Sequence, residues 1–347
     1  MRKRFSKKKI KRIRLFYLVL ILVTCVFTYS FIFHFSNTSF KTQKFDLYIP
    51  SDSLNQNQIE EKLLTATKLD WTLNLAIWIS GIEAKKGLYY IDNKSSNAEI
   101  LNLLKQPQKE IIKVEIGNLR FRYNATARIC KNLDIRSRAL RNALNDLPFL
   151  QSIDSSFNKE NSYALLVQDS LWVYKEITAR ELVKSLHRKW SNYWTEENVV
   201  LAKKQNLTPL EAVILASIVQ AESQKVEELP KIAGLYLNRL KKDMKLQADP
   251  TVIYAIGQKN IHRVLKRHLR VKNPYNTYRY KGLPPGPVYV PSKEALNAVL
   301  NPENHDYFYF VANPELNGYH DFSVTYEEHR EKAKRYREKL NKKRIYK

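Results

Sequence analysis

The chain has 347 residues, 44% of them hydrophobic and 27% charged, which is enough for two or three compact domains. Only 8 glycines and 13 prolines are present, so a collagen-like or low-complexity chain is excluded. The net charge of +25 favours an anionic partner, namely a membrane, an acidic wall polymer or nucleic acid, and does not choose among them.

The first predicted element is a membrane-spanning helix over residues 15–35. These 21 residues contain no Asp, Glu, Lys or Arg, and at about 1.5 Å per residue they reach roughly 30 Å, the thickness of a bilayer core. Nine basic residues precede this run, in the segment 1–14, so the positive-inside rule predicts a cytoplasmic N-terminus and export of everything after Ser36.

For this segment an uncleaved anchor is preferred to a cleaved leader. The apolar core of a signal peptide has about 7–15 residues and ends at a small-residue cleavage site, whereas this run is longer and ends in HFSN. A lipoprotein is disfavoured because Thr24 precedes Cys25 where a smaller residue is expected. Since Cys130 is the only other cysteine, the exported part cannot form an internal disulfide or a cysteine-based metal site. Export also argues against a nucleic-acid partner.

Residues 36–110 carry the pattern of a small β-α-α-β module followed by one more helix. This order is typical of a LysM-like glycan-binding module, and a generic α+β subdomain fits it equally well. The predicted elements are a strand at 45–49, helices at 58–67 and 73–83, a strand at 87–91 and a helix at 97–105.

Residues 111–195 are predicted to form a connecting α+β region. Alternating apolar residues indicate a strand at 111–116, a second strand is expected at 163–167, and a helix is expected from 179 to 190. Tryptophans can stack on sugars, yet buried packing is their commoner role, so none is assigned to a site. The tryptophans concerned are Trp71, Trp78, Trp172, Trp190 and Trp194.

A helix with a well-defined start is predicted from residue 208. Thr208 suits the N-cap, Pro209 the first helical position, and Glu211 the return bond of a capping box. This is the first element of a region, 196–347, that is predicted to carry the chemistry.

Further along this helix, Glu222 is the candidate catalytic acid. Ile214, Ile218 and Glu222 are spaced by four and share one face, so the carboxyl lies on the apolar stripe of the helix. Burial raises the pKa of a carboxyl, which a general acid working near neutral pH requires. Alternatively, Glu222 lies near solvent at the helix end and pairs with Lys225, and the spacing fits either arrangement.

Six sequence blocks follow one another in order over about 115 residues: LTPLEAVILASIVQAES (207–223), AGLYLNRL (233–240), KLQADPTVIYAIG (245–257), NPYNTYRYKGLPPGPV (273–288), HDYFYFVA (305–312) and GYHDF (318–322). Together they resemble the endolytic murein transglycosylases, the YceG-like family. The N-terminal anchor and the LysM-like segment fit the layout of this family more loosely.

The resemblance places the family's catalytic glutamate on Glu222, the second acidic position of its ASIVExE block. The first acidic position is Gln220 here, about 200° away around the helix, so the change need not affect the acid. A second departure is Gln168-Asp-Ser-Leu171, where the family usually has a Pro-Asx-Thr-Tyr turn. This difference puts the shape of one cleft wall in doubt.

The resemblance implies a reaction that needs one carboxyl rather than the two of most glycosidases. The glutamate protonates the leaving oxygen and then, as a base, helps the 6-hydroxyl of muramic acid to attack the anomeric carbon. Nascent peptidoglycan strands would be cut between MurNAc and GlcNAc with 1,6-anhydro ends, and elongation would stop, with no metal or organic cofactor. The implied location is the cytoplasmic membrane of a bacterium, with the catalytic domain outside and peptidoglycan synthases as candidate partners.

Six further residues in these blocks are candidates for substrate binding, because short polar side chains on Pro-bounded loops suit hydrogen bonds to sugars. For Asp249 the N-cap of a helix from Pro250 is the preferred role, Asn276 can equally hold its own turn, and His320 can make a structural hydrogen bond. The candidates are Gln247, Asp249, Asn276, Thr277, Tyr278 and His320.

The predicted architecture is therefore α+β, with an N-terminal transmembrane helix, a LysM-like βααβ module, and a mixed α+β catalytic domain that ends in a charged helix after Thr325. Two other functions stay open. A two-carboxylate hydrolase using Glu222 and Asp249 would leave reducing ends, and a non-catalytic wall-binding scaffold would leave glycan intact.

Overall fold

The computed structural model of the chain describes residues 7–35, 44–49, 61, 63, 71–83, 85–92, 95–106, 110–117, 122–257 and 264–342. The chain divides into two compact units, residues 1–111 and residues 112–347, and each is described by itself.

Unit 1 begins with one long apolar helix. Helix α1 (Lys7–Ser30) continues into a π-helical turn, η1 (Phe31–Phe35), and the stretch Lys11–His34 is long and apolar enough to cross a bilayer. The predicted span at 15–35 is thus helical. The helix starts earlier than predicted, within the basic cluster, because Lys and Arg are themselves good helix formers.

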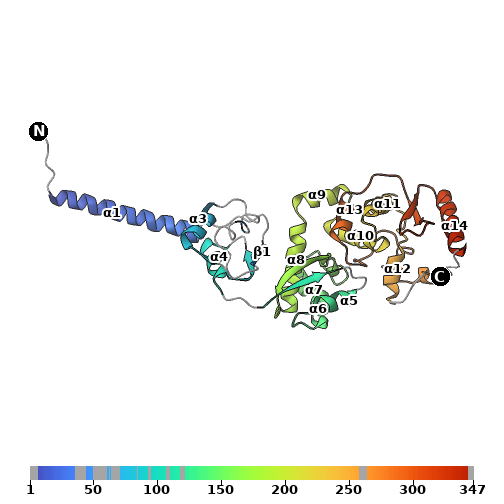
Figure 1. The fold of residues 1–347 in the computed structure, drawn as a ribbon, viewed down its shortest axis with the longest axis horizontal. Coiled ribbons are helices and arrows are strands. Elements are labelled where there is room, and N and C mark those ends of the chain that lie inside the picture. Colours follow the sequence, from blue (N-terminus) through green and yellow to red (C-terminus); the bar gives the residue numbers. More distant parts are fainter. Residues whose placement is uncertain are drawn as a thin grey trace. The chain divides into compact units, whose positions relative to one another are not determined.

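The rest of unit 1 pairs two strands beside two helices (Figure 1). Strand β1 (Lys44–Ile49) runs antiparallel to β2 (Gly87–Asp92), and helices α3 (Trp71–Ser80) and α4 (Asn97–Leu104) pack against each other. These elements confirm four predictions, although α3 stops before residue 83 because Gly81 takes a positive φ of 52°. The predicted helix at 58–67 lies outside the described residues apart from positions 61 and 63, so the LysM-like order stays a prediction.

The end of the apolar helix belongs to the core of unit 1. Ile32 and Phe33 are only 4% and 7% exposed, and they pack with the buried side chains of the module. The buried Asn97 amide donates hydrogen bonds to the Ile32 carbonyl (2.8 Å) and to Thr72 Oγ1 (3.1 Å). The apolar helix and the module therefore share one core.

The first half of unit 2 is mainly helical. Strand β3 (Ile111–Ile116) pairs with β4 (Asp169–Tyr174) to form a two-stranded sheet. The predicted strand at 163–167 is wrong: this segment forms a 3-10 turn, η2 (Ser162–Leu165), whose residues are all buried. A short, wholly apolar run does not distinguish strand from helix, which explains the error. The helices are α5 (Arg122–Ile129), α6 (Ser137–Asn145), α7 (Leu147–Ile153), α8 (Ala179–Tyr193) and α9 (Glu196–Lys204).

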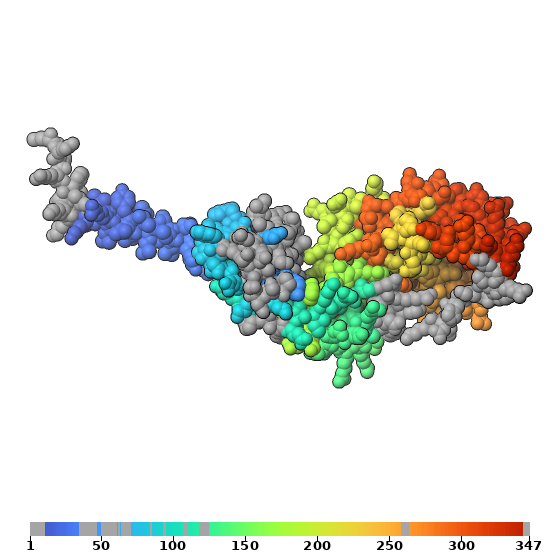
Figure 2. All heavy atoms as spheres, in the orientation of Figure 1, coloured from blue at the N-terminus to red at the C-terminus, as the bar shows by residue number. Residues whose placement is uncertain are grey.

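The second half of unit 2 is built around helix α10 (Pro209–Glu222), which contacts α11, α12 and α13 (Figure 1). In the space-filling view, the early residues of this unit (green) and its C-terminal residues (orange to red) occupy opposite ends (Figure 2). The other elements are η3 (Val226–Glu228), α11 (Leu229–Lys241), α12 (Asp249–Ile256), η4 (His268–Arg270), α13 (Lys293–Leu300), the antiparallel pair β5 (Tyr309–Ala312) and β6 (His320–Ser323), and α14 (Tyr326–Lys342).

Helix α10 begins as predicted and is more deeply buried than predicted. The capping box between Thr208 and Glu211 is formed, and Pro209 occupies the first turn. However, every residue from 212 to 220 is buried, rather than a single apolar stripe. A helix that is apolar on all sides is surrounded by other elements. The helix thus forms the centre of unit 2 and presents its last residue, Glu222, at one end.

Candidate active site

Glu222 is the last residue of α10 and is half-buried. Its Oε1 accepts a hydrogen bond of 2.9 Å from the hydroxyl of Tyr236, which is buried on α11. The alternative pairing with Lys225 is wrong, because the Lys225 ammonium lies over the ring of Tyr319, 4.7 Å from its centroid. The carboxyl is therefore fixed by a phenol rather than by a surface lysine.

The surroundings of Glu222 favour a proton donor. Burial raises the pKa of Glu222 to about 7, the hydrogen bond from Tyr236 opposes this rise, the negative charge of Asp249 adds to it, and the positive charge of Arg239 opposes it. Both protonation states are thus populated near neutral pH, as a group that first gives and then takes a proton requires. Burial, and then the charge of Glu222, raise the pKa of Tyr236 well above its ordinary value, so the phenol remains a donor.

Arg239 is a buried cation close enough to act on Glu222. Its side chain is held by backbone carbonyls: Nε donates to Phe308 (2.6 Å) and a terminal nitrogen donates to Leu246 (2.7 Å). The neighbouring Asn238 similarly donates to the carbonyl of His305 (2.7 Å). These two side chains connect α11 to the segments before α12 and β5.

Asp249 and Tyr278 form a second polar pair near the acid. The Tyr278 hydroxyl donates to Asp249 Oδ1 at 2.6 Å. Although Asp249 is exposed as a residue, burial around its carboxyl raises its pKa, and the Tyr278 hydrogen bond opposes the rise. The N-cap role predicted for Asp249 is wrong, because the N-cap position of α12 is Ala248 and Asp249 is the first helical residue.

Gln247 precedes this pair with its side chain exposed. Its backbone has a φ of +50°, a left-handed conformation that costs energy for a residue other than glycine. The Gln247 N–H donates to the Thr277 carbonyl at 3.2 Å, which holds the residue in this conformation. Strain of this kind often accompanies functional sites.

Asn276 and Thr277 are buried, and their polar groups serve the backbone. The Asn276 amide donates to the carbonyls of Leu269 (3.0 Å) and Val271 (2.9 Å), while its oxygen accepts from the Tyr278 N–H (3.1 Å). Thr277 Oγ1 accepts from the Ala248 N–H at 3.0 Å. These contacts match the turn-holding alternative for Asn276, and they position Tyr278 and the start of α12.

His320 lies at the start of β6 and is bound to a buried acid that the sequence analysis did not single out. Its Nδ1 is 3.0 Å from Glu228 Oε2, and its backbone N–H donates to Glu228 Oε1 at 2.8 Å. Ser223, next to Glu222, also donates to Glu228 (3.1 Å). The Phe310 ring packs edge-on against Tyr236 and His320. The structural hydrogen bond expected as the alternative for His320 is thus present.

The two departures from the family pattern act on the same segment. The buried Gln220 accepts a hydrogen bond from the Ser292 N–H (3.1 Å). Gln168 donates through its amide to the Val290 carbonyl (2.8 Å) and through its N–H to the Pro291 carbonyl (2.8 Å). Both glutamines therefore anchor the chain that enters α13, and neither is bonded to the acid.

Among the described residues, no group of three or more His, Cys, Asp or Glu side chains could hold a metal ion. Of the polar residues around Glu222, Asp249, Tyr278 and His320 were predicted from sequence, whereas Tyr236, Arg239 and Glu228 were missed. Tyr236 lies within the AGLYLNRL block, but nothing in the block distinguishes its side chain from the apolar residues around it. Glu228 lies outside every block.

A helical α+β unit with one glutamate held near its protonation midpoint defines a site suited to protonating a leaving group. A sequence profile of the YceG-like family matches residues 47–335, and the chain belongs to this family.

Curated relatives agree with this assignment. The chain is 34% identical to the endolytic murein transglycosylase of Bacillus subtilis strain 168 over 168 aligned residues. The aligned residues make up 48% of this chain and 46% of that protein. It is 34% identical over 137 residues to the enzyme of the same name from Streptococcus pneumoniae D39, or 38% of this chain and 24% of that protein. The chain thus matches less than half the length of these relatives. The fold resembles the crystal structure of a YceG-like protein from Listeria monocytogenes, with a TM-score of 0.54 at 23% identity, over 83% of this chain and 98% of that one.

Proposed function

We propose that this protein is an endolytic peptidoglycan transglycosylase that cuts nascent glycan strands between MurNAc and GlcNAc, with Glu222 as its acid and base. The observation that carries the proposal is a single glutamate, at the end of the central helix, whose pKa is raised to about 7 and whose carboxyl accepts a hydrogen bond from a buried tyrosine. Membership of the YceG-like family supports the substrate class.

The reaction balances with one carboxyl. Protonated Glu222 gives its proton to the glycosidic oxygen, and the bond from that oxygen to the anomeric carbon breaks. Tyr236 and Arg239 stabilise the carboxylate that remains, through a hydrogen bond and a positive charge. The carboxylate then takes the proton of the muramic acid 6-hydroxyl as its oxygen bonds to the anomeric carbon. The products are a 1,6-anhydro end and a free GlcNAc hydroxyl, Glu222 is protonated again, and no water is consumed.

The remaining candidates have three roles under this proposal. Asp249 and Tyr278 offer polar groups to the sugar because they share the electrostatic environment of Glu222, and Gln247 does so as an exposed residue two positions before Asp249. Asn276 and Thr277 hold these residues in place through the backbone. His320 acts through Glu228 and Ser223 on the end of α10.

The two-carboxylate hydrolase is kept as a second candidate because Asp249 is close enough to raise the pKa of Glu222. For the Asp249→Asn variant, loss of this negative charge should lower the pKa of Glu222, so the decline of activity with rising pH should begin at lower pH. Activity at pH 6 should stay within about tenfold of wild type. A loss of about 10²-fold or more in a folded variant would instead favour the hydrolase.

Removing the phenol beside the acid should shift the pH profile in the other direction. In Tyr236→Phe the ionised form of Glu222 loses a hydrogen bond, so its pKa should rise and the decline of activity should move to higher pH. The matched control is Tyr319→Phe, which removes a hydroxyl bonded to Glu227 at the surface and should leave the profile unchanged. An unshifted profile in Tyr236→Phe would argue against Tyr236 as a partner of the catalytic carboxyl.

The reaction itself is tested by incubating the full-length protein in detergent with peptidoglycan strands and measuring fragment masses. Internal cuts with 1,6-anhydro ends are expected, one water lighter than hydrolysis products. Reducing ends would establish the hydrolase. Intact strands with bound protein would establish the wall-binding scaffold.

For the N-terminal segment we propose an uncleaved single-pass anchor, with the N-terminus in the cytoplasm and the remainder outside the cytoplasmic membrane of a bacterium. Cleavage after residue 36 would remove Ile32 and Phe33 from the core of unit 1, along with the carbonyl that Asn97 binds. An anchor would keep the site beside newly made strands, which makes peptidoglycan synthases candidate partners.

A further inference from the structure

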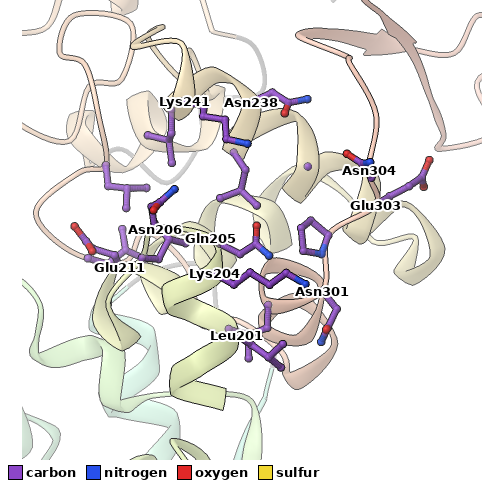
Figure 3. A pocket seen from close by; sticks show the side chains of 18 of the residues that line it. Leu201, Lys204, Gln205, Asn206, Glu211, Asn238, Lys241, Asn301, Glu303 and Asn304 are labelled. Carbon is purple, nitrogen blue, oxygen red and sulfur yellow. The ribbon is translucent and has the colours of Figure 1, made fainter. Parts of the chain in front are cut away.

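An open cavity of about 910 Å³ lies in unit 2 at the opposite end of α10 from Glu222. Its walls come from the end of α9, the start of α10, one face of α11, the turn at 282–284 and the segment 300–305 (Figure 3). Glu211, which lines it, is eleven residues before Glu222, or about 16 Å along the helix. The volume of the cavity is within the range of ligand sites, about 300–1,000 Å³.

Helix α11 separates this cavity from the acid. The α11 residues in its wall are Gly234, Leu237, Asn238, Leu240 and Lys241, and all but Leu240 recur at the spacing of a single helix face. Tyr236, the partner of Glu222, lies about 200° around the helix from Gly234. The cavity is therefore a separate site on the other face of the same helix.

Close backbone approach gives the cavity its shape. A Cβ on Gly234 would lie 2.4 Å from the Glu303 carbonyl oxygen and 2.8 Å from the His305 ring, so the segment 300–305 reaches α11 only because this residue is glycine. His305 is fixed there by its contact with the Lys231 carbonyl, at 2.8 Å. The wall is thus supported by specific contacts.

Two lysines of the cavity wall have no carboxylate partner among the described residues. Lys204 and Lys241 enter it from α9 and α11 (Figure 3), and within the described part of the chain neither has a carboxylate within 4.0 Å. The wall also contains two acidic residues: Glu303 is paired with Lys231 at 3.4 Å, whereas Glu211 accepts the N-cap bonds of Thr208 (2.8 Å each), which orient its carboxylate and leave its negative charge in place. A ligand with a carboxylate would meet two free ammonium groups.

The other wall residues favour a peptide over a sugar. Amides from Gln205, Asn206, Asn301 and Asn304 can bond peptide groups, and aliphatic side chains such as Leu283 can contact methyl groups. The lining includes no Phe, Tyr or Trp among the residues that the structure describes, so the rings on which sugars stack are missing. Amides, methyl groups and carboxylates occur together in the short peptide that hangs from peptidoglycan.

We propose that this cavity binds the peptide stem of the glycan strand, with Lys204 and Lys241 holding its carboxylates. The proposal rests on the proposed function and deepens it, since it makes peptide-bearing strands the preferred substrate. The acid would cut the glycan at one end of α10 while the peptide is held at the other.

The test measures binding of a synthetic stem pentapeptide that ends in D-Ala-D-Ala, by calorimetry with the full-length protein in detergent. Loss of both ammonium groups in Lys204→Gln/Lys241→Gln should weaken binding by about tenfold or more. The control Lys334→Gln/Lys339→Gln removes the same charge from the exposed helix α14 and should bind as wild type does. Glu222→Gln should also bind normally, because the cavity is separate.

Several results would overturn the proposal: no binding of the pentapeptide to wild type, equal binding by the Lys204/Lys241 variant, or competition by a bare GlcNAc oligosaccharide. Thermal melting shows whether each variant is folded. If the double variant is unfolded, pentapeptide binding is measured instead with each single lysine variant and with wild type at increasing salt. Binding that neither the single substitutions nor the added salt weakens would overturn the proposal. Cleavage without pentapeptide binding would refute this proposal alone, whereas pentapeptide binding with intact strands would refute the proposed reaction.

Discussion

Glu222→Gln should reduce strand cleavage by about 10²- to 10⁴-fold while leaving the fold intact. The amide keeps the shape of the side chain and can accept the bond from Tyr236, yet it cannot give up a proton at neutral pH. The measurement is the initial rate of new strand ends at equal protein concentration, together with the melting temperature of each protein.

The matched control for this substitution is Glu227→Gln, five residues further along the chain. Glu227 is exposed, and its carboxylate accepts a hydrogen bond from the Tyr319 hydroxyl. It should retain wild-type activity. Near-normal cleavage by Glu222→Gln would show that Glu222 is not the catalytic acid, independently of the activity of the control.

Gly286→Ala should destabilise unit 2 by about 2–3 kcal/mol. A Cβ at this position would lie 2.0 Å from the Glu160 carbonyl oxygen and 2.9 Å from the Tyr275 hydroxyl, which itself donates to that carbonyl (3.2 Å). Two backbone segments would have to separate to admit one methyl group. The expected fall in melting temperature is roughly 4–12 °C, measured by calorimetry.

Gly117→Ala provides the comparison. A Cβ there meets no atom of the described residues within 4 Å, and Gly117 does not require a positive φ. Its melting temperature should stay within about 2 °C of wild type. Equal effects of the two alanines would mean that the contact between Gly286 and Glu160 is not what restricts the position.

The elements with local signals were predictable from sequence. The capping box of α10 needs only Thr208 and Glu211, and both strands of unit 1 were anticipated from their apolar patterns. The 3-10 turn at 162–165 was mistaken for a strand because a short run that is buried on all sides shows no hydrophobic periodicity. The depth of α10 was underestimated because burial by other helices leaves no local signal, and one of the helices that cover it, α13, begins only at Lys293.

The acid could be proposed from sequence, whereas its partners could not. Tyr236 is fourteen residues from Glu222, and only the packing of α11 on α10 brings the two together. Glu228 and His320 are 92 residues apart and pair through the fold alone. For Asn276, in contrast, the polar side chain suggested a substrate-binding residue. In the structure the side chain is buried and hydrogen-bonds to backbone carbonyls.

The most direct test of the central claim is a ¹³C NMR titration of the side-chain carboxyls in the full-length protein, with the Glu222 signal assigned from its absence in Glu222→Gln. We expect Glu222 to titrate with a pKa of about 7, because burial favours the protonated form. A Glu222 pKa near the ordinary value of 4.5 would mean that the carboxyl is ionised at neutral pH and cannot serve as the acid.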